Sequence, residues 1–210
     1  MPLPLDRPGG TVEDPGTAAR IGVLGGTFDP IHVGHLAAAA EVRAALELDR
    51  VLLMVANVPW QKAGTRAVTP AEHRYAVVEA AAKGIDGVEA SHLEIDRGGP
   101  SYTADTVAEL ARRHPGSDLY LVVGSDVVPD LPTWERVDEV RAGVTLVVVT
   151  RPGAELRLPA PPWRARAVTI PALDVSSSDL RARVAAGRPI DALVPVAGVH
   201  EISRLGLYAG

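Results

Sequence analysis

The chain has 210 residues, of which 47% are hydrophobic and 22% charged, so it is long enough to bury a core in one large globular domain. Its formal net charge of −5 gives no overall attraction for nucleic acid or an anionic membrane, and we expect neither as a partner. The sequence contains no cysteine, which excludes disulfides, thiolate metal sites and cysteine nucleophiles. Because it shows neither a signal peptide nor an apolar run of about 18 residues, we expect a soluble, cytoplasmic protein.

The hydrophobic pattern begins about twenty residues into the chain. Residues 1–19 are rich in proline, glycine and acidic residues and have no periodicity, so we expect a mobile tail there and a folded domain over 20–210. Apolar runs then alternate with helix-forming stretches. We expect strands at 21–24, 51–56, 88–95, 119–124, 144–150 and 167–170, and helices at 35–47, 70–83, 103–114 and 133–142.

This alternation predicts an α/β fold. Several of the strands are apolar on both sides, which is typical of a doubly wound, mostly parallel sheet with helices on both faces. Two helical segments, 176–187 and 196–207, follow each other with no strand between them, so we expect a small C-terminal helical part over 174–210. The proline-rich residues 152–163 suit an exposed connection or a lid.

The stretch GGTFDPIHVGH, residues 25–35, connects the first predicted strand to the first predicted helix. Gly25 and Gly26 lack a Cβ atom, so a ligand can approach the backbone at the strand end where open α/β sheets bind ligands. His32 and His35 flank the start of the helix, whose N–H groups and dipole favour an anion. The stretch has neither the lysine of a P-loop nor a G-x-G-x-x-G pattern. It therefore predicts a phosphate site whose side-chain donors are imidazoles.

Simpler interpretations of this stretch exist. The glycines alone fit a tight turn between strand and helix, and the histidines alone fit helix capping. Two histidines three apart also suit zinc, but the other histidines, at 73, 92, 114 and 200, are scattered and there is no cysteine, so we expect no metal site made by the protein. None of these interpretations requires all the residues of the stretch in this order.

GGTFDPIHVGH resembles the signature of the nucleotidyltransferases that carry a histidine-x-glycine-histidine motif on a Rossmann-like fold. These enzymes transfer a nucleotidyl group from a nucleoside triphosphate and release pyrophosphate. A second motif of that superfamily resembles DVSSSDLR, residues 174–181, although Val175 and Ser178 stand where isoleucine and threonine are commoner. The serines suit helix N-capping, and they are also hydroxyl donors beside Arg181, which can contact a phosphate with two N–H groups.

Three further segments are similar to the bacterial nicotinate mononucleotide adenylyltransferases. They are GGPSYTADTVAEL (98–110), VVGSDVVPDLPTW (122–134) and VVVTRPG (147–153), and the similarity extends from about residue 20 to 208. The resemblance implies transfer of the adenylyl group of ATP to nicotinate mononucleotide, which yields nicotinate adenine dinucleotide and pyrophosphate in NAD biosynthesis. It also implies Mg²⁺, bound mainly through the ATP phosphates. NVPWQKAG (57–64) departs from the family, because Trp60 and Gln61 precede the retained Lys62.

The resemblance also implies a set of site residues. The catalytic residues would be His32, His35, Lys62 and Arg181. ATP would be bound by Gly25, Gly26, Thr27, Phe28, His32, His35, Gly124, Asp126, Arg151, Ser176, Ser177, Ser178 and Arg181. Nicotinate mononucleotide would be bound by Thr27, Lys62, Tyr102, Thr103, Trp134 and Glu135, with the Trp134 ring against the pyridine and backbone N–H groups near Thr103 and Trp134–Glu135 on the carboxylate.

Some of these residues have plainer interpretations. Asp126 and Thr103 could cap a turn and a helix, and Trp134 taken alone would more often be a core residue. Two other functions also remain open: phosphopantetheine adenylyltransferase, which is typically shorter and lacks GGPSYTADT, and a non-catalytic nucleotide sensor, which could lose His32, His35 or Arg181. The sequence does not determine whether the chain forms a homo-oligomer.

Overall fold

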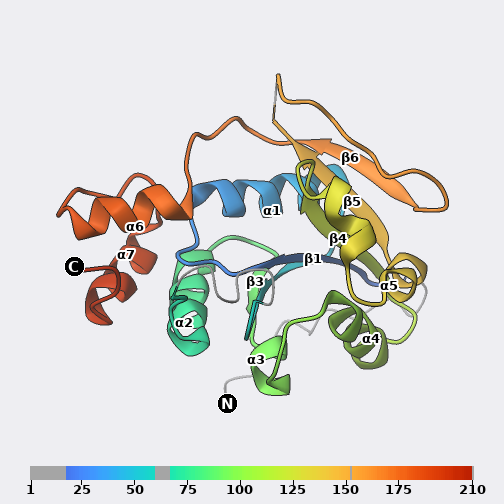
Figure 1. Ribbon diagram of the computed structural model, residues 1–210, viewed down its shortest axis with the longest axis horizontal. Helices are drawn as coiled ribbons and strands as arrows, with labels where there is room; N and C mark the ends of the chain where they lie inside the picture. The colour runs from blue at the N-terminus through green and yellow to red at the C-terminus, as the bar shows by residue number, and fades with distance from the viewer. Residues whose placement is uncertain (1–17, 60–66, 152, 210) are drawn as a thin grey trace, which may run out of the picture.

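The computed structural model of the chain describes residues 18–59, 67–151 and 153–209 (Figure 1). Its centre is a six-stranded parallel sheet in the order β3-β2-β1-β4-β5-β6. The strands are β1 (Arg20–Gly26), β2 (Arg50–Val55), β3 (Val88–Ser91), β4 (Asp118–Gly124), β5 (Thr145–Thr150) and β6 (Ala165–Thr169). This is the strand order of a Rossmann-like, doubly wound sheet, so the predicted fold class is confirmed. Residues 1–17 of the predicted tail lie outside the described residues.

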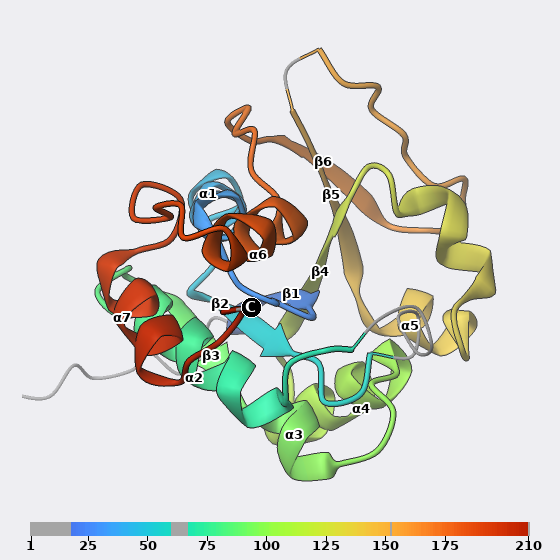
Figure 2. The ribbon, with the colours of Figure 1, turned by 60° about the vertical axis from the view of Figure 1, so that its left-hand side comes forward.

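Helices cover both faces of the sheet, as the sequence predicts (Figures 1 and 2). One face carries α1 (Val33–Ala45), α2 (Ala71–Ala82), α6 (Ser177–Ala185) and α7 (Val196–Arg204). The other carries α3 (Leu93–Arg97), α4 (Thr103–Arg113), the 3₁₀ helix η2 (Val128–Thr133) and α5 (Val137–Gly143). No helix within the described residues is both long enough and apolar enough to cross a membrane.

The central strands β1, β2, β4 and β5 each contribute side chains to two separate cores. In β2, Val51, Leu53 and Val55 pack beneath α1 and α2, whereas Leu52 and Met54 belong to the core beneath α3, α4 and α5. Burying an aliphatic side chain of this size stabilises the fold by about 1.5–3 kcal/mol. The continuous apolar runs of the sequence therefore reflect a sheet that is covered on both sides.

The topology creates a crevice between β1 and β4. Leu24 of β1 pairs with Leu53 of β2 on one side and with Val122 of β4 on the other. The chain leaves β1 toward α1 on one face and leaves β4 toward η2 and α5 on the opposite face. The carboxyl ends of these two strands thus form the switch point at which open α/β sheets bind ligands.

Two predicted elements differ from the structure. The strand predicted at 88–95 ends at Ser91, and α3 begins at Leu93, because an apolar run this short does not distinguish a strand from a helical turn. The helix predicted at 133–142 is divided into η2 and α5. Pro132 lies at the end of η2, and Arg136 has a left-handed backbone with φ of 50°, which redirects the chain before α5.

The C-terminal helical part packs beside α1 and α2 on one face of the sheet. Helix α6 lies near the N-terminus of α1, and α7 lies along α2 (Figures 1 and 2). Gly198 allows this approach, since a Cβ atom there would lie 3.1 Å from the Cβ atom of Ala81. The predicted helices at 176–187 and 196–207 are both present.

A buried arginine connects the segments that follow β1 and β2. Arg74 of α2 is 1% exposed, and its guanidinium donates to the carbonyl groups of Thr27 at 2.7 Å, Ala56 at 2.6 Å and Thr69 at 2.7 Å. Buried carbonyl groups without a donor cost about 1–3 kcal/mol each. Arg74 therefore stabilises the irregular backbone at the open end of the sheet.

We expect Arg74→Met to lower the free energy of unfolding by about 3 kcal/mol or more, because it leaves several buried carbonyl groups unpaired while keeping most of the side-chain volume. The measurement is urea unfolding followed by circular dichroism. Arg113→Met is the matched control: Arg113 pairs with Glu109 on the surface, and its loss should cost about 1 kcal/mol or less. Equal losses in the two variants would contradict the role given to Arg74.

Candidate active site

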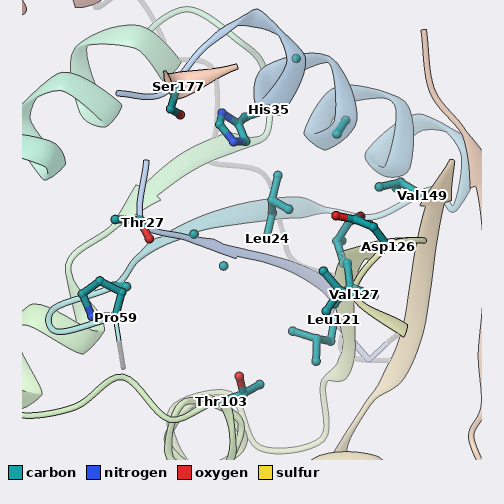
Figure 3. Close-up of a pocket in the computed structure, with 18 of the residues that line it drawn as sticks. Leu24, Thr27, His35, Pro59, Thr103, Leu121, Asp126, Val127, Val149 and Ser177 are labelled. Carbon is teal, nitrogen blue, oxygen red and sulfur yellow. The ribbon is translucent and has the colours of Figure 1, made fainter. Parts of the chain in front are cut away.

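A cavity of about 500 Å³ opens at the carboxyl ends of β1 and β4 (Figure 3). His35 and Ser177 lie along one side of it, Thr103 lies opposite, and Asp126 lies toward β5. The predicted site residues that line it are Gly25, Gly26, Thr27, His32, His35, Tyr102, Thr103, Gly124, Asp126, Trp134, Glu135, Arg151, Ser176 and Ser177. Segments from the five sequence motifs are thus brought together around one cavity.

Four predicted site residues are not among those that line the cavity. Phe28 is buried beside it and packs edge-on against the His35 ring, with the ring centroids 5.0 Å apart. Ser178 and Arg181 lie on α6, close to the start of α1. Lys62 lies outside the described residues.

The glycines at the cavity have different surroundings. A Cβ atom on Gly25 would meet nothing within 4 Å, so this position is open toward the cavity. On Gly26 it would lie 2.8 Å from the Phe28 ring, and on Gly124 it would collide with the carboxylate of Asp126. Gly25 therefore leaves room for a ligand, whereas Gly26 and Gly124 leave room for neighbouring side chains.

The two histidines of the first motif form a stacked pair. His32 is the N-cap of α1, and its backbone N–H donates to Nδ1 of His35 at 3.3 Å. Because Nδ1 of His35 accepts this bond, the proton of a neutral His35 ring lies on Nε2. The ring centroids are 3.7 Å apart with an interplanar angle of 25°. His32 and His35 therefore cap α1 and also place their imidazoles at the cavity.

Burial keeps His32 neutral. Its side chain is enclosed at the base of the cavity, and this burial, with the nearby charge of Arg151, lowers its pKa from 6.5 to about 4. Its Nδ1 atom is buried and has no hydrogen-bond partner among the described residues. A neutral ring can stack closely on His35 without charge repulsion and can donate from one nitrogen.

The backbone between β1 and α1 is bonded to side chains from α6. Ser177 Oγ donates to the carbonyl of Pro30 at 2.8 Å, and Arg181 Nη1 donates to the carbonyl of Asp29 at 2.6 Å. Phe28 has a left-handed backbone with φ of 47°, a conformation that needs such support in a residue with a side chain. The second motif therefore contacts the first directly.

The serines of the second motif have distinct contacts. Ser176 is the N-cap of α6 and accepts the N–H of Asp179 at 3.1 Å, so the capping interpretation is correct for this residue. Ser178 Oγ accepts from Arg181 at 3.4 Å. Because Ser176 and Ser177 also line the cavity, capping does not prevent them from facing a ligand.

The opposite side of the cavity offers backbone donors. Thr103 is the first residue of α4 and Tyr102 is its N-cap, so Thr103 is not the cap. The Trp134 N–H donates to the carbonyl of Leu131 at 3.1 Å. The N–H groups of Thr103 and Glu135 have no acceptor within residues 18–59, 67–151 and 153–209. The available donors are therefore those of Thr103 and Glu135, and not that of Trp134.

Trp134 has both a core side and a cavity side. Its ring packs against the core beneath α4 and α5, as the plainer interpretation expects, and it also lines the cavity. Its Nε1 atom is buried without a partner in the described part of the chain. A ring fixed by packing on one face can offer the rest of its surface to a planar ligand.

A buried carboxylate in the cavity wall, Glu94, is absent from the predicted site residues. Glu94 of α3 is 7% exposed and accepts the Thr106 hydroxyl at 2.5 Å, and burial raises its pKa while hydrogen bonds from Ser101 and Thr106 oppose that rise. Its charge is partly balanced by Arg97, 3.9 Å away. Within a predicted strand nothing distinguished Glu94 from a solvent-facing residue. The structure shows that it connects α3 to the first turn of α4.

The remaining side of the cavity is formed after β4 and β5. Asp126 is exposed, and its carboxylate accepts no hydrogen bond from a described residue, so the turn-capping interpretation is not supported. Ser125 Oγ donates to the carbonyl of Glu155 and accepts the N–H of Arg157, both at 2.8 Å. The described part of the 152–163 segment is therefore an exposed connection bonded to the residue beside Asp126.

Within the described residues, no cluster of three or more histidine or acidic side chains could hold a metal ion. The cavity near His35 is lined by imidazoles and hydroxyls.

Comparison with known proteins assigns the family. The family model described as "Cytidylyltransferase-like" matches residues 23–183. A Roseiflexus sp. protein described as "Probable nicotinate-nucleotide adenylyltransferase" is 47% identical over 199 residues, covering 91% of this chain and 99% of its own. A Saccharopolyspora erythraea protein of the same description is 44% identical over 192 residues, covering 91% and 90%. The chain belongs to the nicotinate-nucleotide adenylyltransferases.

Solved structures agree on the fold. The Plasmodium falciparum nicotinic acid mononucleotide adenylyltransferase complexed with NaAD superposes with a TM-score of 0.71 and 19% sequence identity, covering 90% of this chain and 97% of the other. The cavity of this nucleotidyltransferase lies at the switch point of that fold.

We expect His32 to titrate near pH 4 in imidazole NMR spectra, whereas His92 should titrate above its ordinary value, because Glu72 and Asp96 bond to its ring and raise its pKa. Because folding lowers the His32 pKa from 6.5 to about 4, protons bind more tightly to the unfolded chain than to the folded one. The stability that this residue contributes is therefore complete above pH 6.5 and is lost as the pH falls toward 4. His32→Gln, in which the low-pH signal should vanish, assigns the resonance. A His32 titration at the ordinary value would refute the buried, neutral ring.

Proposed function

We propose that the chain uses this cavity to transfer the adenylyl group of ATP to nicotinate mononucleotide, releasing pyrophosphate and nicotinate adenine dinucleotide. The observation that carries the assignment to this cavity is the stacked, partly buried imidazole pair at the start of α1, opposite the Thr103 N–H. The proposal covers one nucleotidyltransferase domain over residues 20–210, with 174–210 as its C-terminal helical part.

The phosphates of ATP would lie between α1 and α6. His35, with its Nε2 proton, and neutral His32 would donate to phosphate oxygens, and the N-termini of the two helices would add backbone donors and favourable dipoles. Thr27 would orient the phosphates from the end of β1. Arg181 already uses one N–H on Asp29 and one on Ser178, so its remaining N–H groups would contact phosphate, with Lys62 as a second cation.

The reaction needs no general base. The attacking 5′-phosphate of the mononucleotide is anionic near pH 7, so the protein has to align it with the α-phosphorus and stabilise the charge on the departing pyrophosphate. Imidazoles that are fixed by stacking and capping meet this requirement, since they do not have to reorganise as the charge develops.

Mg²⁺ fits this site as an ion carried by the nucleotide. The described residues provide no carboxylate cluster for it, whereas the phosphate oxygens of ATP and water are the ligands that Mg²⁺ prefers. When bound, the ion supplies neutralisation of phosphate charge. The imidazoles and helix N-termini would act on the oxygens that the ion leaves uncovered.

The adenosine would extend toward β4 and β5. Gly124 and Asp126 would hold the ribose, since the Asp126 carboxylate is exposed at the cavity and can accept from two hydroxyls. The backbone around Arg151 would border the adenine. Ser125 keeps the segment after β5 in place beside this position.

The pyridine would lie against Trp134, with its carboxylate near the N–H groups of Thr103 and Glu135. Those donors have no acceptor within the described residues, and the first turn of α4 adds a dipole term of about 0.3–1 kcal/mol. A nicotinamide would turn an NH₂ group toward the same donors, at a cost of about 1–3 kcal/mol for each lost contact. The arrangement therefore favours the acid over the amide.

We expect pyrophosphate release from ATP with nicotinate mononucleotide to exceed that with nicotinamide mononucleotide by about tenfold or more in kcat/KM, as the loss of one such contact implies. Phosphopantetheine should give no turnover.

Trp134→Ala should weaken the binding of both mononucleotides alike, because stacking contacts the ring and not its substituent. Trp163→Ala, which changes a tryptophan of the same core outside the cavity, is the control. Equal turnover of acid and amide would refute the backbone-donor idea.

We expect His35→Ala to lower kcat by about 10²–10³-fold, the typical loss for one preorganised donor to a developing charge. ATP affinity should fall much less, which equilibrium binding and steady-state kinetics would separate. His200→Ala, an exposed histidine of α7, should leave both quantities unchanged. A near-normal kcat in the His35 variant would remove His35 from the catalytic role.

A further inference from the structure

The residues after α7 return to the first motif. The chain passes through two left-handed residues, Gly206 with φ of 61° and Tyr208 with φ of 65°, and the Tyr208 ring packs against the core beneath α1 and α2. The Tyr208 hydroxyl donates to Asp29 Oδ1 at 2.8 Å, across a sequence separation of 179 residues. A left-handed backbone in a residue with a side chain is sparsely populated and persists where surrounding contacts hold it.

The bond joins a buried carboxylate to a half-buried tyrosine. Asp29 is 1% exposed, and burial raises the pKa of Tyr208, with the Asp29 charge acting in the same direction. The Tyr208 hydroxyl therefore keeps its proton and remains a donor to the carboxylate at neutral pH. Its oxygen is also hydrogen-bonded to Thr69, which precedes α2.

Asp29 lies where its position affects the imidazoles. It precedes the N-cap residue His32 within a segment that forms neither helix nor strand. Its main-chain carbonyl is bonded to Arg181, and its side chain to Tyr208. Both the main-chain carbonyl and the carboxylate of Asp29 are thus bonded to residues from the C-terminal helical part.

We propose that Tyr208 is a positioning residue for adenylyl transfer: its bond to Asp29 sets the path of residues 29–32, and thereby the stacking and burial of His32 and His35. This inference rests on the proposed function. A bond with only a structural role would contribute to the stability of the fold and leave the imidazoles and the kinetics of the folded enzyme unchanged.

The test is Tyr208→Phe, which removes the hydroxyl and keeps the ring. We expect kcat per folded enzyme to fall about 10- to 100-fold, because small misplacements of catalytic groups have effects of this size. KM for ATP should change less than kcat, and the preference for nicotinate should persist because other elements form the pyridine side. Tyr75→Phe is the matched control, since its hydroxyl donates to Glu79 on the surface of α2 at 3.1 Å, and it should behave as wild type.

A second readout does not depend on turnover. In Tyr208→Phe the His32 pKa, measured by NMR, should rise from about 4 toward 6.5 as the ring loses its enclosure. Asp29→Ala, which removes the acceptor, should give the same shift, and the double variant should be no worse than Asp29→Ala alone, because the bond is already absent in that variant. If the wild type fails to use nicotinate mononucleotide, the proposed function is wrong while the NMR result still decides the positioning role.

An unchanged His32 pKa in both folded single variants would overturn the inference, as would additive losses in the double variant. A fall in kcat that matches the loss of folded enzyme in thermal melts would also overturn it. Should Tyr208→Phe fail to fold, Asp29→Ala provides the same NMR measurement.

Discussion

Between Thr27 and Ile31 the backbone has no helix or strand to bond its carbonyl groups, and the arrangement of the site depends on the donors that replace them. Arg74 bonds to the carbonyl of Thr27, Arg181 to that of Asp29 and Ser177 to that of Pro30. Buried backbone groups must be paired, so a phosphate-binding turn this irregular requires side chains from elsewhere in the chain.

These contacts give residues of the second motif a structural role beside any role toward a ligand. Arg181 has a structural bond to the first motif in addition to any contact with phosphate, and Ser176 caps the helix while facing the cavity. The plainer interpretations of these residues are therefore compatible with the chemical ones. Structural bonds of this kind hold donors in place before a ligand arrives, which is what preorganised electrostatic stabilisation requires.

Much of this architecture could be predicted from patterns of local sequence. A covered parallel sheet with a ligand site at its open end is predicted by the apolar runs of β1, β2, β4 and β5 and by the glycines after β1. Strand burial and backbone access depend on the residue type at each position and can therefore be predicted locally. Contacts between residues far apart in the chain cannot be predicted in this way. Arg74 resembles any charged residue of a surface helix, and Glu94 lies in a run whose period fits a strand. The use of the Trp134 N–H within its own turn also depends on the 3₁₀ backbone of η2, which contains Pro132.

The separation of the partners in sequence has a consequence for synthesis on the ribosome. Pro30 and Asp29 are bonded to Ser177 and Arg181, which follow them by 147 and 152 residues. All six strands precede α6, so the donors that α6 supplies to the turn after β1 are synthesised only after every strand of the sheet. A fragment that ends before α6 would contain every strand and both imidazoles but would lack the α6 side chains that bond to the turn between β1 and α1. Synthesis of the sheet and completion of this turn are therefore separate events along the growing chain.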